Sequence, residues 1–273
     1  MKIEKHKVAG HELYTGDCLE VMKKIPSSSV KLIITDPPYN IGLNYGNYKD
    51  RKNTREYFIW LKERLNQMAR LLTNDGSLYL INYPELNART IPILDKKLIF
   101  RRWLTWHYPT NIGHSKNNWT RSQRSILFYT KSLDNVFNKN DIVQPYKNPE
   151  VTKVKKRILA GSKGRTPYDC LVQEDLSEIL NEPLDVIRTN LLKNVSKDRM
   201  KNHPCQLPKP LIKVLMLASS NKNDIVLDPF AGTFMVSLVA MELNRHSIGI
   251  EINPRFVKMG MERLKNEKKK KGD

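Results

Sequence analysis

The sequence has few cysteines and no long apolar run. Its three cysteines are scattered, odd in number and without metal-ligand spacing, which excludes a disulfide-stapled scaffold and predicts no metal site. No apolar stretch approaches the ~20 residues of a membrane-spanning helix. Residues 1–6 lack the apolar segment of a secretory signal. We therefore expect a cytoplasmic protein with reduced thiols and no membrane contact.

Acidic residues are scarce relative to basic ones. The chain carries 47 Lys and Arg against 28 Asp and Glu, a formal net charge of +19. Residues 101–131 contain no acid at all, and residues 147–165 contain one. Such clusters are typical of proteins that bind a phosphate backbone, although a solvated surface gives the same pattern, which we favour for the lysines at 268–271. The candidate DNA-binding residues in the two central clusters are Lys116, Arg121, Arg124, Lys153, Lys155, Lys156 and Arg157.

The tetrapeptide Asp36-Pro37-Pro38-Tyr39 is the most informative feature of the chain. It follows the apolar stretch 30–35, which predicts a buried strand that ends at the edge of a sheet. Open α/β sheets carry their chemistry at the carboxyl ends of such strands. The two prolines remove two N–H donors, so we expect free acceptor carbonyls there. A carboxylate, a carbonyl and an aromatic ring suit a planar group that bears an NH2, such as the exocyclic amine of a nucleobase.

A second motif begins at residue 224. Residues 224–228 predict a strand, followed by a Gly-containing turn and a helix over 235–243, the geometry that brings backbone close to a cofactor. A further short strand at 247–251 ends in an acid that is placed to accept from ribose hydroxyls. The candidate cofactor-binding residues here are Asp228, Pro229, Phe230, Ala231, Gly232, Thr233 and Glu251.

Together these motifs resemble the permuted β class of S-adenosylmethionine-dependent DNA amino-methyltransferases, which methylate N6 of adenine or N4 of cytosine. As in that class, the catalytic motif precedes the cofactor motif, Gly16-Asp17 lies near the start, and residues 203–206 read His-Pro-Cys-Gln. The resemblance covers residues 11–132 and 195–265. It implies S-adenosylmethionine as the cofactor, with Asp17 and His203 helping to hold it, and double-stranded DNA as the substrate.

The resemblance assigns catalysis to Asp36, Pro37, Pro38 and Tyr39. The target base would leave the duplex and stack on Tyr39, while the Asp36 carboxylate and the Pro37 carbonyl accept hydrogen bonds from its amino group. Asp36 followed by Asn40 favours adenine N6, with cytosine N4 as the alternative. A homodimer and a cognate restriction endonuclease are the protein partners that the family suggests.

Two departures leave other interpretations open. Phe234 stands where the family usually carries a glycine, so a catalytically inactive nucleic-acid-binding module is an alternative from another class. Cys205, within Pro-Cys-Gln, resembles the nucleophile of 5-methylcytosine enzymes, although no Glu-Asn-Val partner motif is present. Methylation of RNA is a further alternative, against which the permuted motif order argues.

The expected fold is α/β, a doubly wound, mostly parallel sheet of the Rossmann-like methyltransferase type. We expect an antiparallel edge pair of strands and a small inserted recognition region. The expected helices cover residues 19–25, 54–72, 84–98, 208–220 and 254–271, and the expected strands cover 12–15, 30–35, 77–83, 100–108 and 125–130, with a turn at 74–76.

The chain is expected to divide into three parts. Residues 1–132 form the catalytic half of the methyltransferase domain, residues 133–195 the inserted basic target-recognition region, and residues 196–273 the cofactor-binding half. The glycine- and amide-rich loop 40–53 is interpreted as a lid over the extruded base, with Tyr45 and Tyr48 as stacking or wedge residues; a surface loop that orders only with substrate is the alternative.

Overall fold

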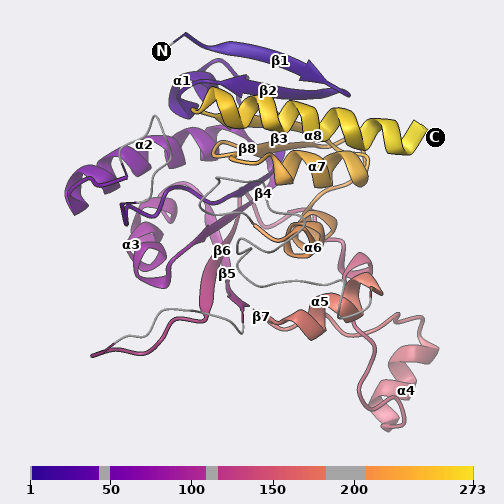
Figure 1. The fold of residues 1–273 in the computed structure, drawn as a ribbon. Coiled ribbons are helices and arrows are strands. Elements are labelled where there is room, and N and C mark those ends of the chain that lie inside the picture. Colours follow the sequence, from indigo (N-terminus) through magenta and orange to yellow (C-terminus); the bar gives the residue numbers. More distant parts are fainter. Residues whose placement is uncertain (1, 43–49, 109–115, 183–206, 273) are drawn as a thin grey trace.

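Figure 1 shows the computed structural model of the chain, in which residues 2–42, 50–108, 116–182 and 207–272 are described. In this part of the chain, one nine-stranded sheet has the order β1-β2-β9-β8-β3-β4-β6-β5-β7. The strands are β1 (Glu4–Val8), β2 (His11–Thr15), β3 (Val30–Thr35), β4 (Leu72–Asn82), β5 (Ile99–His107), β6 (Gln123–Thr130), β7 (Cys170–Leu171), β8 (Ile225–Asp228) and β9 (His246–Glu251). The helices are α1 (Cys18–Lys23), α2 (Thr54–Leu71), α3 (Pro84–Leu94), α4 (Thr152–Leu159), α5 (Gln173–Leu180), α6 (Lys209–Ser219), α7 (Met235–Glu242) and α8 (Pro254–Gly272), with a 3-10 turn η1 (Lys139–Asp141).

The strand order places the two sequence motifs side by side. β3 pairs in parallel with both β8 and β4, and β9 pairs in parallel with β8 and β2. Because the carboxyl ends of parallel strands meet at one edge of a sheet, the residues after β3 and β8 come together although they are far apart in the sequence. The expected α/β, mostly parallel architecture is confirmed.

The antiparallel pair β5–β6 is also confirmed, but its position at the sheet edge is wrong. β7 pairs in parallel with β5 and forms the outermost strand on that side, while β1 pairs antiparallel with β2 on the other. β7 has only two residues, so its sequence offers no periodic pattern from which a strand is predicted.

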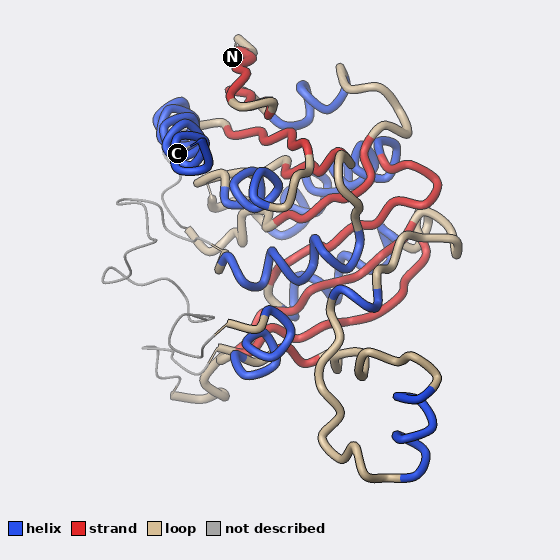
Figure 2. The backbone as a smooth tube through the Cα atoms, turned by 90° about the vertical axis from the view of Figure 1, so that its right-hand side faces the viewer, coloured by secondary structure: helices blue, strands red, loops and turns tan. Residues whose placement is uncertain are grey.

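The central strands are apolar on both faces, as strands of a covered parallel sheet must be. Leu32 and Ile34 of β3 belong to a core formed with α6, α7 and α8, whereas Ile33 belongs to a second core formed with α1, α2 and α3. All three side chains are completely buried. Helices therefore cover both faces of the sheet, as Figures 1 and 2 show.

The predicted elements differ from the observed ones mainly at their ends. α2 begins where Asn53 accepts a hydrogen bond from the Glu56 N–H, as predicted. α3 ends at Leu94, short of residue 98, because the amides of Lys97 and Leu98 turn back to the Leu94 carbonyl. The predicted turn at 74–76 lies within β4, and the extra residues are absorbed by a register shift against β3.

The described part of the insertion, residues 133–182, has a docked portion and a projecting one. Leu176 of α5 is completely buried in the core beside α6. α4 has no buried residue, and Figures 1 and 2 show it extending away from the sheet. β1, α4, α5 and β7 were not predicted. Across the described ranges, every helix is too short or too polar to cross a membrane.

Candidate active site

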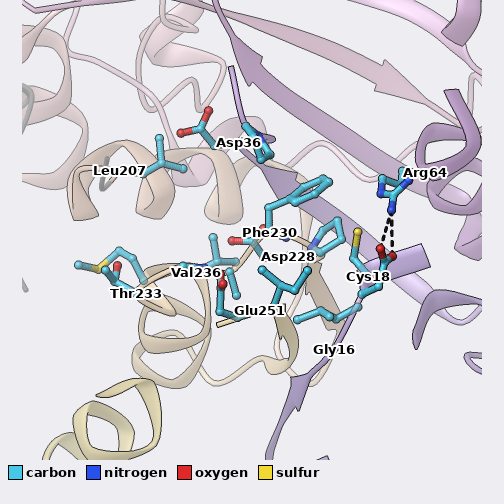
Figure 3. Close-up of a pocket in the computed structure, with 18 of the residues that line it drawn as sticks. Gly16, Cys18, Asp36, Arg64, Leu207, Asp228, Phe230, Thr233, Val236 and Glu251 are labelled. Carbon is cyan, nitrogen blue, oxygen red and sulfur yellow. Dashed lines mark hydrogen bonds and ion pairs between the residues drawn. The ribbon is translucent and has the colours of Figure 1, made fainter. Parts of the chain in front are cut away.

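The ends of β3, β8 and β9 open into one pocket, shown in Figure 3. The pocket contains about 890 Å³ free of protein atoms, its open mouth included. Residues of the predicted cofactor motif and of the predicted catalytic motif both line it. The predicted residues that line it are Asp17, Asp36, Pro38, Asp228, Pro229, Phe230, Ala231, Gly232, Thr233 and Glu251.

Two carboxylates of the pocket, the buried Asp228 and the partly buried Glu251, have raised pKa values. Asp228 Oδ1 accepts hydrogen bonds from Thr35 Oγ1 and from the Phe230 N–H, both at 3.1 Å. Burial, with a smaller contribution from the nearby charges of Asp36 and Glu251, raises the pKa of Asp228 to about 7 against the lowering effect of those hydrogen bonds. Burial also raises the pKa of Glu251 to about 7.

Glu251 organises the turn that follows β8. Its Oε2 accepts from the Gly232 N–H at 2.9 Å and its Oε1 from the Asn253 N–H at 2.8 Å. Gly232 has a φ of 48°, in the left-handed region that favours glycine. The turn therefore holds the glycine backbone and the Glu251 carboxylate against the same side of the pocket. Each carboxylate oxygen retains acceptor capacity for a ligand hydroxyl.

The pocket fits S-adenosylmethionine in charge. The cofactor carries a cationic sulfonium and an ammonium group, and the pocket collects the carboxylates of Asp36, Asp228 and Glu251 in largely apolar surroundings. A bound cation would favour the charged form of Asp228, whose pKa is raised mainly by burial. The donor and acceptor set therefore matches the cofactor that the sequence implies.

Asp17 lies at the pocket but is held by other protein groups. Its carboxylate caps α1 by accepting from the Leu19 N–H at 2.7 Å, and it pairs with Arg64 Nη2 at 2.8 and 2.9 Å (Figure 3). The Arg64 side chain is only 4% exposed and its guanidinium lies 4.2 Å from the Trp60 ring centroid. Arg64 and Trp60 line the pocket, and neither was predicted from the sequence. Within the amphipathic stripe of α2, no sequence signal separates them from ordinary core and surface positions.

Phe234 lies outside the pocket. Its ring is completely buried in the core, although its neighbours Thr233 and Met235 line the pocket. A Cβ added at Gly249 would lie 2.6 Å from the Phe234 ring, and one added at Gly260 would lie 2.3 Å from it. Two glycines in β9 and α8 thus leave the space that the ring fills. Phe234 has a left-handed backbone, φ 58°, a conformation that glycine adopts more readily.

The catalytic tetrapeptide is held by hydrogen bonds at both ends. The Tyr39 hydroxyl donates to Asp36 Oδ2 at 2.7 Å, and the Tyr57 hydroxyl donates to the Pro38 carbonyl at 2.8 Å. The expectation that both proline carbonyls are free acceptors is therefore wrong for Pro38. Tyr57 is a buried residue of α2, so its hydroxyl anchors the turn to the helix layer. The Pro37 carbonyl stays the predicted second acceptor.

The Tyr39 ring is buried, with 3% of its surface exposed. Its centroid lies 4.7 Å from that of Tyr83 and 5.2 Å from the Arg124 guanidinium. For a base to stack on Tyr39, the groups that cover the ring must therefore move.

The predicted DNA contacts differ in their exposure to solvent. Lys116 and the four basic residues of α4 (Lys153, Lys155, Lys156 and Arg157) are exposed. Arg121 is partly exposed and pairs with Glu85. Arg124 is 5% exposed, so its predicted role as a phosphate contact does not fit its burial. The predicted cofactor residue His203, the alternative nucleophile Cys205, and Tyr45 and Tyr48 of the proposed lid lie outside the described residues.

Comparison with known proteins identifies the family. The family model described as DNA methylase matches residues 30–262. The chain is 35% identical over 251 residues to the DNA adenine methyltransferase YhdJ of Escherichia coli (strain K12), covering 91% of this chain and 81% of that protein. It is 31% identical over 257 residues to the type II methyltransferase M.HpaI of Haemophilus parainfluenzae, covering 93% and 74%.

A solved structure agrees in fold. The PvuII DNA methyltransferase, described as cytosine-N4-specific, superposes with a TM-score of 0.68 at 16% identity and covers 97% of this chain and 93% of its own. At that identity the similarity concerns the fold. The family match covers both motifs and the strands that join them at the pocket. The chain therefore belongs to the S-adenosylmethionine-dependent DNA methyltransferases that act on N6 of adenine or N4 of cytosine.

Proposed function

We propose that this protein methylates N6 of adenine in double-stranded DNA. The observation that carries the proposal is the position of Asp36. It directly follows the last residue of β3, lines the cofactor pocket and accepts a hydrogen bond from the Tyr39 hydroxyl. The similarity to a protein named as a DNA adenine methyltransferase supports adenine as the base.

The proposed mechanism is direct transfer to an amino group that the protein has oriented. S-adenosylmethionine, when bound, supplies an electrophilic methyl group on a cationic sulfur. The carboxylates of Asp228 and Glu251 would hold it, together with the backbone of the Gly232 turn. Asp36 and the Pro37 carbonyl would accept from the target NH2 and draw its nitrogen toward a nucleophilic, tetrahedral geometry. Most of the rate then comes from positioning and electrostatics.

The structure bears on two of the alternatives. Phe234 was the ground for an inactive module, and its side chain occupies the core and leaves the pocket open. The match to an amino-methyltransferase family argues against Cys205 as a ring nucleophile. Transfer to cytosine N4 uses the same residues and stays the alternative product.

The test is methylation of duplex DNA with labelled S-adenosylmethionine, followed by digestion to nucleosides and mass spectrometry. N6-methyladenine is the expected product. N4-methylcytosine would keep the mechanism and change the base. No product on DNA, despite demonstrated cofactor binding, would contradict the proposal and direct the search to RNA.

The insertion at 133–195 is the proposed target-recognition region. Its projecting helix α4 presents Lys153, Lys155, Lys156 and Arg157 to solvent, which suits contact with phosphates. A DNA substrate also supports a cytoplasmic location. The similarity to a protein named as a type II methyltransferase supports a cognate restriction endonuclease as a partner. A homodimer is proposed from the family, and sedimentation velocity tests it.

A further inference from the structure

A buried arginine lies directly behind the catalytic tetrapeptide. Arg124 is the second residue of β6, which runs antiparallel to both β4 and β5. The start of β6 therefore lies at the same sheet edge as the carboxyl ends of β3, β4 and β5. With 5% of its surface exposed, Arg124 is enclosed by protein at the edge where catalysis takes place.

Three tyrosines surround the Arg124 guanidinium, each from the segment that follows a different strand. Tyr39 follows β3, Tyr83 follows β4 and Tyr108 follows β5. The guanidinium carbon lies 5.2, 4.1 and 5.3 Å from their respective ring centroids. Arg124 Nη2 donates to the Tyr83 hydroxyl at 3.2 Å, and Nη1 donates to the Tyr108 hydroxyl. A planar guanidinium can stack and donate at the same time, which a lysine ammonium cannot.

The tyrosines favour the charged form of this buried group. Burial by itself lowers the pKa of Arg124, but Tyr39, Tyr83 and Tyr108 outweigh it and raise the pKa above its usual value. A cation that is enclosed by aromatic rings is more strongly bound to them than one in water. The cluster therefore joins the ends of three strands.

This unit contacts the catalytic carboxylate through Tyr39. The Tyr39 ring packs on Tyr83 with centroids 4.7 Å apart, and its hydroxyl donates to Asp36 Oδ2 at 2.7 Å. Displacing the guanidinium would free both rings and loosen the hydrogen bond that orients Asp36.

We propose that Arg124 is a positioning residue for methyl transfer, which holds Tyr39 and through it Asp36, and that it is not a contact for DNA phosphates. This inference rests on the proposed role of Asp36 in transfer. It assigns Arg124 a function different from that of Arg121, only three residues away. The Arg121 guanidinium also lies over the Tyr83 ring, at 3.8 Å, but its side chain is 35% exposed and can reach a ligand.

The first experiment uses Arg124→Lys, which keeps the charge and removes the planar fork. In the full-length protein we expect kcat to fall about 10- to 100-fold, as for a misplaced catalytic group, with the cofactor Kd unchanged within about twofold. Unchanged cofactor binding also serves as the folding control. A wild-type kcat in this variant would overturn the proposal.

A double-mutant cycle tests the route through Tyr39. Tyr39→Phe removes the hydroxyl that donates to Asp36, so Arg124→Lys should cost much less in that background than in the wild type. Equal costs in the two backgrounds would overturn the proposed route.

The salt dependence of DNA binding separates positioning from phosphate contact. Arg124→Gln should leave the slope of log K against log salt unchanged, whereas the matched variant Arg121→Gln should reduce it by about one. A reduced slope for Arg124→Gln would overturn the proposal. If the wild type itself transfers no methyl group to DNA, the proposed function fails, while this comparison of binding slopes still decides whether Arg124 contacts phosphate.

Discussion

The arginines Arg64 and Arg124 and the basic residues of α4 have the same chemistry, but the first two are buried and the others are exposed. Arg64 and Arg124 are at most 5% exposed and are fixed by Asp17, Trp60 and tyrosine rings. The basic side chains of α4 lie in solvent, and the ion pair between Lys155 and Glu150 is exposed on both sides. Exposed ion pairs stabilise by only about 0–1 kcal/mol.

This difference shows that burial decides what a cation does. An enclosed guanidinium cannot be screened by water, so it organises the groups around it. An exposed one keeps its side chain mobile and its charge available to a polyanion. The net charge of +19 therefore combines two functions that only their surroundings distinguish.

The largest expected effect concerns Asp36, which we propose Arg124 to hold in place through Tyr39. Asp36→Ala should abolish methyl transfer, because the target amino group loses its charged acceptor. Cofactor binding, measured by titration, should remain largely intact. Asp36→Asn is the matched variant that keeps the shape and removes the charge. Retained full activity in either variant contradicts the assignment of Asp36.

A second prediction separates the core behind the pocket from the pocket itself. Phe234→Ala should lower the free energy of unfolding by about 3–5 kcal/mol, because it leaves a cavity between Gly249 and Gly260. Denaturant unfolding measures this loss. Phe100→Ala is the control, since Phe100 is 43% exposed and should cost far less. At temperatures where the variant is folded, cofactor affinity should stay near that of the wild type, and a large loss would place Phe234 in the binding site after all.

A third prediction tests the exposed cations. Replacing all four basic residues of α4 with glutamine should weaken DNA binding and reduce the salt slope by up to about four, one for each phosphate that the helix no longer neutralises. The matched control replaces the four lysines at 268–271 with glutamine and so removes the same charge. We expect a smaller change in slope there. Equal changes in the two variants would show that only net charge matters.

The smallest expected effect is a pH dependence of cofactor affinity. Asp228 and Glu251 have pKa values of about 7, so both are partly protonated in the cofactor-free protein at neutral pH. A cationic ligand favours their charged forms, so its binding releases protons from carboxyls that were protonated beforehand. Affinity should therefore fall as the pH drops from 8 to 6, by up to about tenfold per pH unit for each proton that binding releases. Calorimetry in buffers of different ionisation enthalpy measures the proton release. S-adenosylhomocysteine, which lacks the sulfonium charge, should show a weaker dependence, and equal dependence for the two ligands would contradict this account.

The raised pKa values of Asp228 and Glu251 also make the stability of the folded protein depend on pH. Both carboxyls have folded pKa values above their unfolded values of about 4, so their contribution to stability is complete below pH 4 and is lost as the pH rises through 7. In the cofactor-free protein, Asp228→Asn should reduce this loss. Thermal unfolding of the variant and the wild type between pH 5 and 8 measures the difference.

Local patterns in the sequence were sufficient for the elements with strong periodicity. The apolar run of β3 and the stripe of α2 predicted their bounds to within a residue. β7 was missed because two residues carry no period, and α4 was missed because its eight residues are too few to separate a helix from a basic loop.

The sequence by itself determined the family, because the residues that we propose to contact the amino group and the cofactor are contiguous in short motifs after strands. Only the tertiary structure decided the role of each supporting residue. Arg64 reaches Asp17 from a helix, Arg124 joins three strand ends, and Phe234 fills a space left by two distant glycines. These roles depend on contacts between residues far apart in the chain, and no local pattern encodes burial of that kind.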